Sequence, residues 1–396
     1  MEKKNFAWPV TVVGDYDNRA MKSFMKEYET VLKKKKIVIF GAGIRGTIFS
    51  ILLAGEGYTD LRFTDNNEKK IGHYVNEFPI IALDEVQKEK DNFFIIISVE
   101  NGQAIKEQLE TLGFCEGIHY AAVENYVYAN YIEKFFKEGE WETLIFGDCG
   151  LSDIGIKENN TQTLGMLLEE KNDVNKTKVL ALHGMGMRAY YEIFKAHCKY
   201  VKQPKKLMVM ANFETFTGKQ HLLPRSQHVP VFEMLYSRLK DANIYEYMCL
   251  AQKRFSDITM DYFLSSKEHA GNSQNNDRLV IKMNYMYHLS LQNECVQYMF
   301  LLSEFCNENN IELAFFIPPV NYQYAEMLWG DRFSERYNDN CRTLIKEWDE
   351  RGIKYLDLSY LLTSDCFADI KTIDECANYR GRTRQADEIV CFMKNM

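Results

Sequence analysis

The sequence predicts an α/β protein of two domains, each built around a parallel β-sheet. Short continuous runs of apolar residues alternate with stretches of helical length, which is typical of strand–helix–strand units. This alternation occurs twice, before and after a connecting helix predicted at Tyr126–Glu140. The length of 396 residues fits two or three domains of ordinary size. We therefore predict a first domain over residues 1–130 and a second over 131–396.

Composition excludes several other architectures and functions. Hydrophobic residues make up 46% and charged residues 26% of the chain, which argues against a disordered, collagen-like or coiled-coil protein. The formal net charge is 48 − 56 = −8, so we do not expect a general nucleic-acid binder that neutralises phosphates.

The sequence further indicates a soluble, cytoplasmic protein. Residues Met1–Tyr16 are interrupted by Pro9 and Gly14 and lack the apolar segment of a secretory signal. The longest apolar stretches are far too short to span a membrane. The ten cysteines are scattered without a CxxC pair, which is typical of reduced, mostly buried thiols.

In the first domain, continuous β-type runs predict buried strands, and the stretches between them predict helices. The expected strands are Lys36–Phe40, Leu61–Phe63, Pro79–Ile81 and Phe93–Ser98. The expected helices are Arg19–Lys35, a helix from the glycine-rich turn to about Gly55, and Gln103–Thr111.

A glycine-rich turn, Gly41-x-Gly43-x-x-Gly46, follows the first of these strands. In such a turn the first glycine permits a tight bend, the second lets the backbone approach a phosphate, and the third allows close helix packing. Asp65, at the end of the next strand, is placed to accept hydrogen bonds from a ribose. The pattern therefore predicts a nucleotide-binding turn.

The stretch Lys36–Phe114 resembles the N-terminal Rossmann-like domain of sugar acetyltransferases and other surface-glycan proteins. The resemblance rests on VIFGAGIRG, FTDNN, FPII and the terminal Leu112-Gly113-Phe114. It implies that the turn and Asp65 bind a nucleotide-sugar. NAD(P) and a purely structural domain are the alternatives.

In the second domain the predicted strands are again separated by helical stretches. They are Thr143–Phe146, Lys178–Leu182, Leu207–Met210, Ile311–Ile317 and Lys354–Leu358. A long intervening segment, near residues 215–276, predicts an inserted helical cap, and Arg382–Lys394 predicts a final helix.

Cys149 lies in Phe146-Gly147-Asp148-Cys149-Gly150-Leu151-Ser152-Asp153, just after the first strand of this domain. A nucleophile at the carboxyl end of a strand, directly before a helix, is exposed, and the helix dipole favours its anion. A cysteine thiol there can attack an ester or thioester. The turn Asp148–Gly150 is therefore a candidate catalytic site.

Residues 142–389 resemble the SGNH (GDSL) hydrolase family, which implies a flavodoxin-like α/β/α domain. The turn at Cys149 resembles the first family block, with cysteine in place of the serine. By this resemblance, the Cys149 and Gly184 backbone N–H groups and the Asn212 side chain form the oxyanion hole. Cys376 stands where the family has its histidine, with Asp374 two residues before it.

The segment Phe316-Ile317-Pro318-Pro319-Val320-Asn321 further resembles the subgroup related to the D-alanyl transfer protein of teichoic acid modification.

The chain lacks the family's histidine, so another base is needed. His221 and His228, shortly after the Asn212 block, are the first candidates, and His183 is the third. The alternatives for His221 and His228 are that they lie in a surface loop or have a capping role, or that they bind a phosphate or carboxylate together with Lys219 and Arg225. Cys149 could be an unreactive residue of a retained binding pocket, and Asp374 an N-cap of the final helix.

The function implied by these resemblances is acyl (acetyl) ester transfer or hydrolysis on a sugar or glycan precursor in surface polysaccharide assembly. A nucleotide-sugar or acyl-CoA is the expected ligand, and surface-glycan biosynthesis enzymes are the expected partners. The alternatives are a non-catalytic binding protein that has lost the triad and an NAD(P)-dependent enzyme centred on the first domain. No His, Cys, Asp and Glu set has recognisable metal-ligand spacing, so we predict no metal site.

Overall fold

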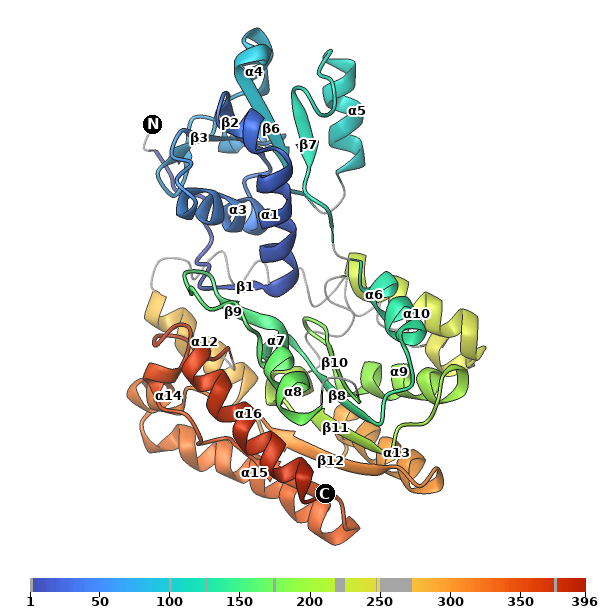
Figure 1. The fold of residues 1–396 in the computed structure, drawn as a ribbon. Coiled ribbons are helices and arrows are strands. Elements are labelled where there is room, and N and C mark those ends of the chain that lie inside the picture. Colours follow the sequence, from blue (N-terminus) through green and yellow to red (C-terminus); the bar gives the residue numbers. More distant parts are fainter. Residues whose placement is uncertain are drawn as a thin grey trace. The chain divides into compact units, whose positions relative to one another are not determined.

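The computed structural model describes residues 3–99, 102–125, 127–173, 176–217, 225–246, 248–249, 273–373 and 376–396, with 225–227 and 273–276 known only as helical backbone. The chain divides into two compact units. The first comprises Met1–Tyr126 with Gly155–Asn159, and the second comprises Val127–Ile154 with Asn160–Met396. Each unit contains a parallel β-sheet flanked by helices (Figure 1), so the predicted α/β class is confirmed.

The sheet of the first unit has the strand order β3-β2-β6-β7, with all neighbours parallel. The strands are β2 (Lys36–Phe40), β3 (Leu61–Thr64), β6 (Phe93–Ile97) and β7 (Tyr120–Ala122). Every residue of β6 is buried, as expected of a central strand covered on both faces. The predictions of β2, β3 and β6 from continuous apolar runs are confirmed. The strand β7 was not predicted.

Helices cover both faces of this sheet. Val38 and Ile95 pack against residues of α4 (Leu83–Lys88) and α5 (Gln103–Thr111). On the opposite face, the ring of Tyr28 lies 5.4 Å from that of Phe94. The remaining elements are β1 (Val12–Gly14), α1 (Asp15–Glu27), α2 (Glu29–Leu32), α3 (Ile44–Gly55), η1 (Glu68–Lys70), β4 (Tyr74–Val75), β5 (Phe78–Pro79) and η2 (Lys90–Asn92).

Two predictions for this unit were wrong in part. The helix expected at Arg19–Lys35 is divided between α1 and α2 at Tyr28, whose backbone leaves the helical conformation. The strand expected at Pro79–Ile81 is the two-residue β5, which pairs antiparallel with β4. Proline has no N–H to donate, so a central position in the parallel sheet is unfavourable for Pro79.

Among the described residues of the second unit, five parallel strands have the order β10-β8-β11-β12-β13. The strands are β8 (Thr143–Gly147), β10 (Thr177–Ala181), β11 (Lys206–Met210), β12 (Glu312–Ile317) and β13 (Lys354–Asp357). All five were predicted, with bounds that differ by at most one residue at either end. Because β10, β8 and β11 are adjacent and parallel, the turns that follow them meet at one edge of the sheet.

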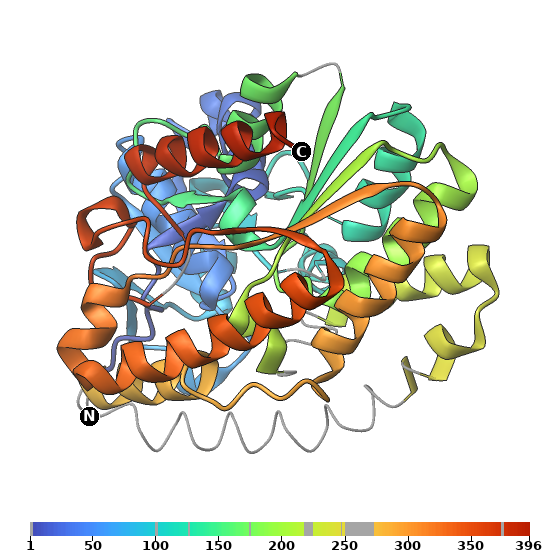
Figure 2. The ribbon, with the colours of Figure 1, turned by 90° about the horizontal axis from the view of Figure 1, so that it is seen from below.

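Helices also cover both faces of the second sheet (Figure 2). On one face, Ile145 and Met208 pack against α8 (Leu164–Asn172) and α16 (Tyr379–Lys394). On the other face, Phe146 packs against α6 (Tyr128–Glu138) and α9 (Met187–Tyr200), and Phe315 stacks on Trp348 of α15 (Asp331–Arg351). The remaining elements are α7 (Cys149–Ser152), β9 (Asp153–Gly155), η3 (Phe213–Thr217), α10 (Arg225–Leu239), α12 (Ser273–Asn284), α13 (Glu294–Glu308), α14 (Tyr322–Trp329) and η4 (Ser364–Cys366).

His197 of α9 is completely buried and packs against the rings of Phe135 and Phe136. Within the described part of the chain, neither ring nitrogen has a hydrogen-bond partner. Burial therefore lowers the pKa of His197 to about 4, because the interior disfavours the charged imidazolium. This imidazole is a core side chain.

Across the described ranges, no helix combines the length and the apolar character that a membrane span requires.

Candidate functional site

Cys149 is the first residue of the short helix α7 and is separated by one residue, Asp148, from the end of the inner strand β8. The preceding Asp148 caps this helix, since its Oδ1 accepts a hydrogen bond of 3.0 Å from the Gly150 N–H. The thiol is half-buried. The strand end and the cap together hold Cys149 at the carboxyl edge of the sheet.

His183 lies in a tight turn that follows β10. The Met185 N–H donates to the Leu182 carbonyl at 3.1 Å, and Gly184 has a φ of 68°. A positive φ at the third residue of a turn strongly favours glycine, which explains Gly184. The turn leaves the His183 side chain 60% exposed.

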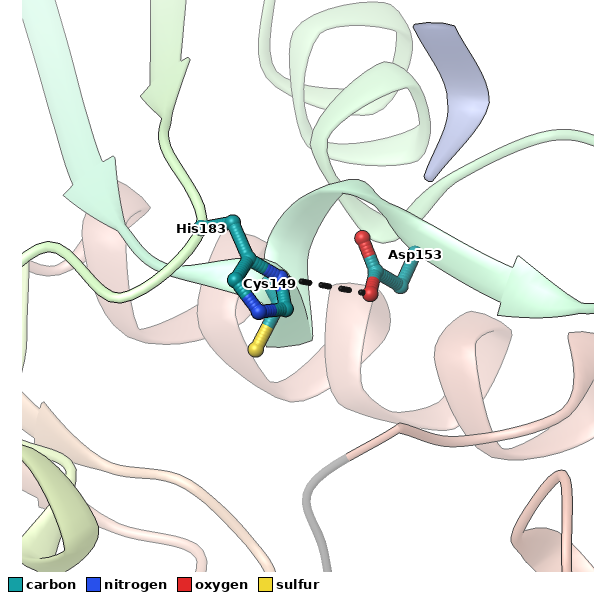
Figure 3. A group of neighbouring side chains, drawn as sticks. All are labelled: Cys149, Asp153 and His183. Carbon is teal, nitrogen blue, oxygen red and sulfur yellow. Dashed lines mark ion pairs between the residues drawn. The ribbon is translucent and has the colours of Figure 1, made fainter. Parts of the chain in front are cut away.

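The two turns bring three side chains together, those of Cys149, Asp153 and His183 (Figure 3). One ligand-type atom from each, the sulfur, a carboxylate oxygen and a ring nitrogen, lies within 4.8 Å of the other two. The His183 Nδ1 and the Asp153 Oδ2 form an ion pair at 3.8 Å. Cys149 and Asp153 are four residues apart, one at each end of the single helical turn α7. The arrangement is that of a nucleophile, a base and an orienting carboxylate.

The surroundings of His183 favour its protonated form. The pKa of His183 lies well above its usual value, mainly because the negative charge of a Cys149 thiolate raises it. Desolvation by the surrounding protein lowers this pKa, and the Asp153 carboxylate raises it further. Asp153 is almost completely buried, and its other oxygen, Oδ1, accepts from the Ser152 hydroxyl at 3.1 Å. The carboxylate therefore faces the imidazole through Oδ2.

The side chains of His228 and Tyr128 form hydrogen bonds with the backbone of His183. His228 of α10 lies with its Nε2 at 2.9 Å from the His183 carbonyl, so this nitrogen is the donor. The His228 ring also packs on Tyr128, with ring centroids 5.6 Å apart. Burial raises the pKa of Tyr128 to about 12, although a hydrogen bond from the His183 backbone works in the opposite direction. His228, predicted as a base, thus contacts the backbone of another histidine.

Asn212, predicted for the oxyanion hole, follows β11 and is buried. Its amide donates to the Asp148 Oδ2 at 2.7 Å, and its oxygen accepts from the Glu214 N–H at 2.9 Å. Burial raises the pKa of the Asp148 carboxyl, although its two donors oppose this. Asn212 is therefore fixed beside the turn that carries Cys149, and Gly184 lies in the turn on the other side, after β10.

The C-terminal block is a packed structural region in the described residues. Cys376 is buried, and its carbonyl accepts from the Ala368 N–H at 2.9 Å. Its thiol is not part of the group formed by Cys149, Asp153 and His183. The fully buried Arg382 donates to the carbonyls of Asn160, Gln162 and Ala377. The predicted site residues His221 and Asp374 lie outside the described residues.

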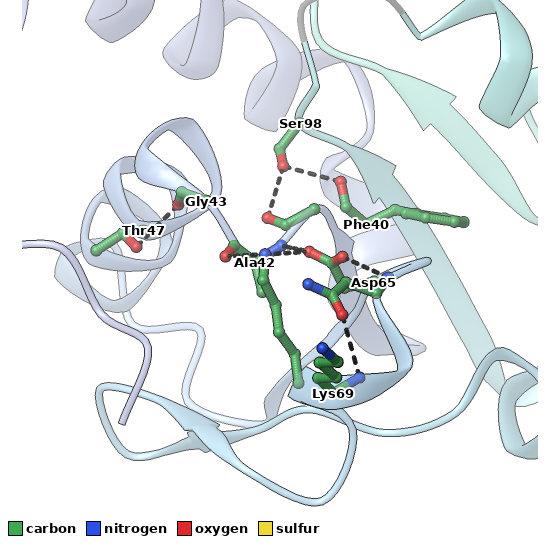
Figure 4. A network of polar contacts seen from close by, with 10 residues as sticks. Phe40, Ala42, Gly43, Thr47, Asp65, Lys69 and Ser98 are labelled. Carbon is green, nitrogen blue, oxygen red and sulfur yellow. Dashed lines mark hydrogen bonds and ion pairs between the residues drawn. The ribbon is translucent and has the colours of Figure 1, made fainter. Parts of the chain in front are cut away.

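The predicted nucleotide-binding turn of the first unit is closed by its own side chains (Figure 4). The Asp65 Oδ2 accepts from the Ala42 N–H and from the Lys70 ammonium, both at 2.8 Å, and its Oδ1 accepts from the Asn67 N–H at 2.9 Å. Burial acts to raise the pKa of Asp65, but the hydrogen bonds from Lys70 and the two N–H groups lower it overall. The carboxylate predicted for a ribose is thus bonded within the protein.

The three glycines of this turn have the conformations that such a turn needs. Gly41 has a φ of 113°. A Cβ on Gly46 would lie 2.0 Å from the Gly41 carbonyl oxygen, so only glycine fits there. A Cβ on Gly43 would meet no atom within 4 Å, which leaves this position open. Whether a phosphate binds at Gly43 stays a prediction.

Asp153 is the site residue that the sequence analysis missed. Its spacing of four residues from Cys149 was the available signal, since residues i and i+4 of a helix share a face. The group formed by Cys149, Asp153 and His183 also contains the donor types that hold Zn²⁺ in proteins. Their positions along the sequence do not resemble a metal motif, because the third residue comes from another turn.

Comparison with known proteins gives partial matches. Residues 33–117 match the model of a family described as C2185-like, N-terminal. No curated protein matches the chain.

Three solved structures are similar to this chain. One, described as an acylhydrolase from Bacteroides fragilis, has 8% identity, covers 69% of this chain and 98% of its own, and has a TM-score of 0.36. A lipolytic protein of the G-D-S-L family from Desulfitobacterium hafniense has 11% identity, coverages of 63% and 98%, and a TM-score of 0.33. A GDSL-like lipase from Bacteroides thetaiotaomicron has 7% identity, coverages of 67% and 97%, and a TM-score of 0.36. Since these scores lie below 0.5, the α/β class rests on the parallel sheets of this chain itself.

Proposed function

We propose that the protein is a thiol-dependent acyl hydrolase or acyltransferase in which Cys149 is the nucleophile, His183 the base and Asp153 the residue that orients it. The observation that supports this best is the approach of the three functional atoms to within 4.8 Å of one another. A thiol next to an imidazole, itself next to a carboxylate, has the geometry needed for nucleophilic catalysis.

The reaction starts from the pair in which His183 holds the proton of the Cys149 thiol, in agreement with the raised pKa of this imidazole. The sulfur attacks the acyl carbonyl, the carbon–oxygen bond of the ester breaks, and His183 gives the proton to the leaving alcohol. This leaves an acyl thioester on Cys149. Water or an acceptor hydroxyl then attacks the thioester, His183 takes its proton, and the thiol is restored. Water as the second reactant gives hydrolysis, and an acceptor hydroxyl gives transfer.

Three groups are proposed to stabilise the negative charge that develops on the acyl oxygen. They are the backbone N–H groups of Cys149 and Gly184 and the side-chain amide of Asn212. One amide hydrogen of Asn212 donates to Asp148, and we assign the other to the oxyanion. The adjacency of β10, β8 and β11 supports this assignment, because these strands carry the three groups to one edge of the sheet.

The finer description of the reaction is also a proposal. The sequence resemblances favour a sugar or glycan precursor as acceptor, in surface polysaccharide assembly in the cytoplasm. They also favour a nucleotide-sugar as ligand of the first unit, in the turn Gly41–Gly46. In that turn, Asp65 already accepts hydrogen bonds from the Ala42 N–H and the Lys70 ammonium. A ribose hydroxyl that binds to Asp65 would therefore have to displace one of these two donors.

The decisive experiment incubates the full-length protein with an activated acetyl ester such as p-nitrophenyl acetate and follows both p-nitrophenol and intact mass. We expect a burst of p-nitrophenol with a single acetyl adduct, which peptide mapping locates on Cys149. Cys149→Ala should abolish both signals. Cys391→Ala, which removes an exposed thiol elsewhere, is the matched control and should change neither.

Equal burst amplitudes in the wild type and in Cys149→Ala would contradict the proposal. So would an adduct on the exposed Cys391 in place of Cys149. Either result would favour the non-catalytic binding protein as the function of this unit.

A further inference from the structure

We propose that Cys149, Asp153 and His183 also form a binding site for a thiophilic divalent cation of the Zn²⁺ type, and that the metal blocks acylation while it is bound. The group offers sulfur, nitrogen and oxygen donors from two adjacent turns, all within 4.8 Å. Metal binding rests on these donors alone. The block rests on the proposed function, since it requires that Cys149 be the nucleophile.

The chemistry of the donors selects the class of ion. Thiolate and imidazole are preferred by Zn²⁺ and similar ions, whereas Mg²⁺ and Ca²⁺ prefer oxygen ligands only. A Cys149 thiolate and the Asp153 carboxylate carry two negative charges that compensate a divalent cation. Binding uses the thiolate and an unprotonated nitrogen of the imidazole, so the one proton shared by the two side chains is released to solvent.

The nitrogen–oxygen spacing is close to that of a tetrahedral site, and the sulfur lies within 4.8 Å of both atoms. With Zn–S, Zn–N and Zn–O bonds of about 2.0–2.3 Å, neighbouring ligand atoms in a tetrahedron are roughly 3.4–3.6 Å apart. The 3.8 Å between the His183 Nδ1 and the Asp153 Oδ2 is a few tenths of an ångström longer. His183 is exposed and can rotate to close this gap, whereas the buried Asp153 is held by the Ser152 hydroxyl.

The number of donors leaves room for a ligand from solvent. Three protein ligands and one open position are typical of an exchangeable or catalytic zinc site, whereas structural sites use four protein ligands. The exposure of His183 gives solvent access to this position. The metal and the acyl group compete for the same sulfur, because a thiolate bound to the metal is not available for attack on a carbonyl.

The test uses Co²⁺ as a spectroscopic probe with the full-length protein after treatment with a chelator. A thiolate bound to Co²⁺ gives a ligand-to-metal charge-transfer band in the near ultraviolet, and Zn²⁺ should displace Co²⁺ and remove the band. We expect the band in the wild type and in Cys391→Ala, and we expect Cys149→Ser to lack it. Asp153→Asn should weaken Co²⁺ binding. At free Zn²⁺ about 100-fold above its dissociation constant, acetyl adduct formation should fall about 100-fold.

The outcomes separate this inference from the proposed function. Absence of the charge-transfer band in a wild type that forms the adduct overturns the metal site and supports the function. An undiminished band in Cys149→Ser also overturns it, because the metal then binds another thiol. In a third outcome, the Co²⁺ band depends on Cys149, but the protein forms no acetyl adduct when it is assayed without metal. This result supports the metal site and contradicts the proposed function. Cys149→Ser differs from the wild type by one atom, so we expect its melting temperature to be unchanged. If it is unchanged, loss of the band is not due to unfolding.

Discussion

The glycine turn of the first unit and the Cys149 turn of the second occupy equivalent positions in their sheets. Each follows a strand with parallel neighbours on both sides and leads into a helix. In the first, Asp65 receives three hydrogen bonds from its own unit. In the second, Cys149, Asp153 and His183 face one another, and His183 is open to solvent. The same position in the topology thus carries a carboxylate bonded within the protein in the first unit and a solvent-accessible group of three polar side chains in the second.

The largest expected effect comes from the removal of the imidazole at the reactive turn. His183→Gln should slow acetylation of Cys149 by about 10²–10⁴-fold, the range that a positioned base contributes. Its melting temperature should stay close to that of the wild type, because the side chain is exposed. Stopped-flow release of p-nitrophenol measures the rate, and His288→Gln, away from this group, is the control. An unchanged rate in His183→Gln would assign the base to another residue and remove the distinction between the two turns.

The second effect concerns the buried imidazole of His197, which has no hydrogen-bond partner among the described residues. With its pKa lowered to about 4, His197 is neutral in the folded protein, while the unfolded chain gains a proton below its usual value of about 6.5. The free energy of unfolding should therefore fall by about 3 kcal/mol as the pH decreases from 6.5 to 4. Urea unfolding at several pH values measures this. His197→Leu should reduce that loss, and an equal loss in the variant would contradict the assignment.

A smaller effect is expected from opening the closed turn. Asp65→Ala leaves the Ala42 and Asn67 N–H groups without their acceptor and the Lys70 ammonium with only the Ala42 carbonyl, which should cost about 1–3 kcal/mol of stability. Acetylation of Cys149 should not change, since the residue lies in the other unit. Thermal unfolding and the acetyl adduct assay, run on the same preparation, test both statements. If the variant lost acetylation at unchanged stability, the view of this turn as a framework would be wrong.

The smallest effect is expected from the residues behind His183. His228→Phe keeps an aromatic ring against Tyr128 but loses the donor to the His183 carbonyl, so kcat should fall by about tenfold with little change in KM. His228→Gln retains a donor and should recover part of the rate. Steady-state kinetics with p-nitrophenyl acetate distinguish the two variants. If His228→Phe kept the full rate and His228→Gln lost it, packing of the ring would be the cause and the hydrogen bond would have no role.

Much of the fold could be predicted because strands buried on both faces appear as continuous apolar runs. The bounds of β2 and α5 agree with the prediction residue by residue. An apolar run did not give a strand of the parallel sheet at Pro79, because proline lacks the N–H that such a strand needs; this residue lies in the short antiparallel pair of β4 and β5. β7 was missed because its sequence, Tyr-Ala-Ala, is short and has no β-branched residue.

The candidate site was harder to predict, because it depends on two turns that meet in space. Cys149 was evident from its position after a strand, and His183 was considered as a base only after His221 and His228. In the structure His183 lies in the turn next to Cys149 and His228 contacts the His183 carbonyl, whereas His221 lies outside the described residues and stays a prediction. Asp153 was not considered, since its role becomes visible only when His183 is placed opposite α7.

The three side chains of the proposed catalytic group all lie in one continuous stretch, from the end of β8 to the turn after β10. A nascent chain that has been synthesised as far as β11 therefore already contains the complete set. A base carried by the C-terminal block would be added only after the last strand, β13. Apart from Asn212 and His228, which are proposed to support the reaction, later parts of the chain can then change without loss of a proposed reacting group, provided that they still cover the sheet.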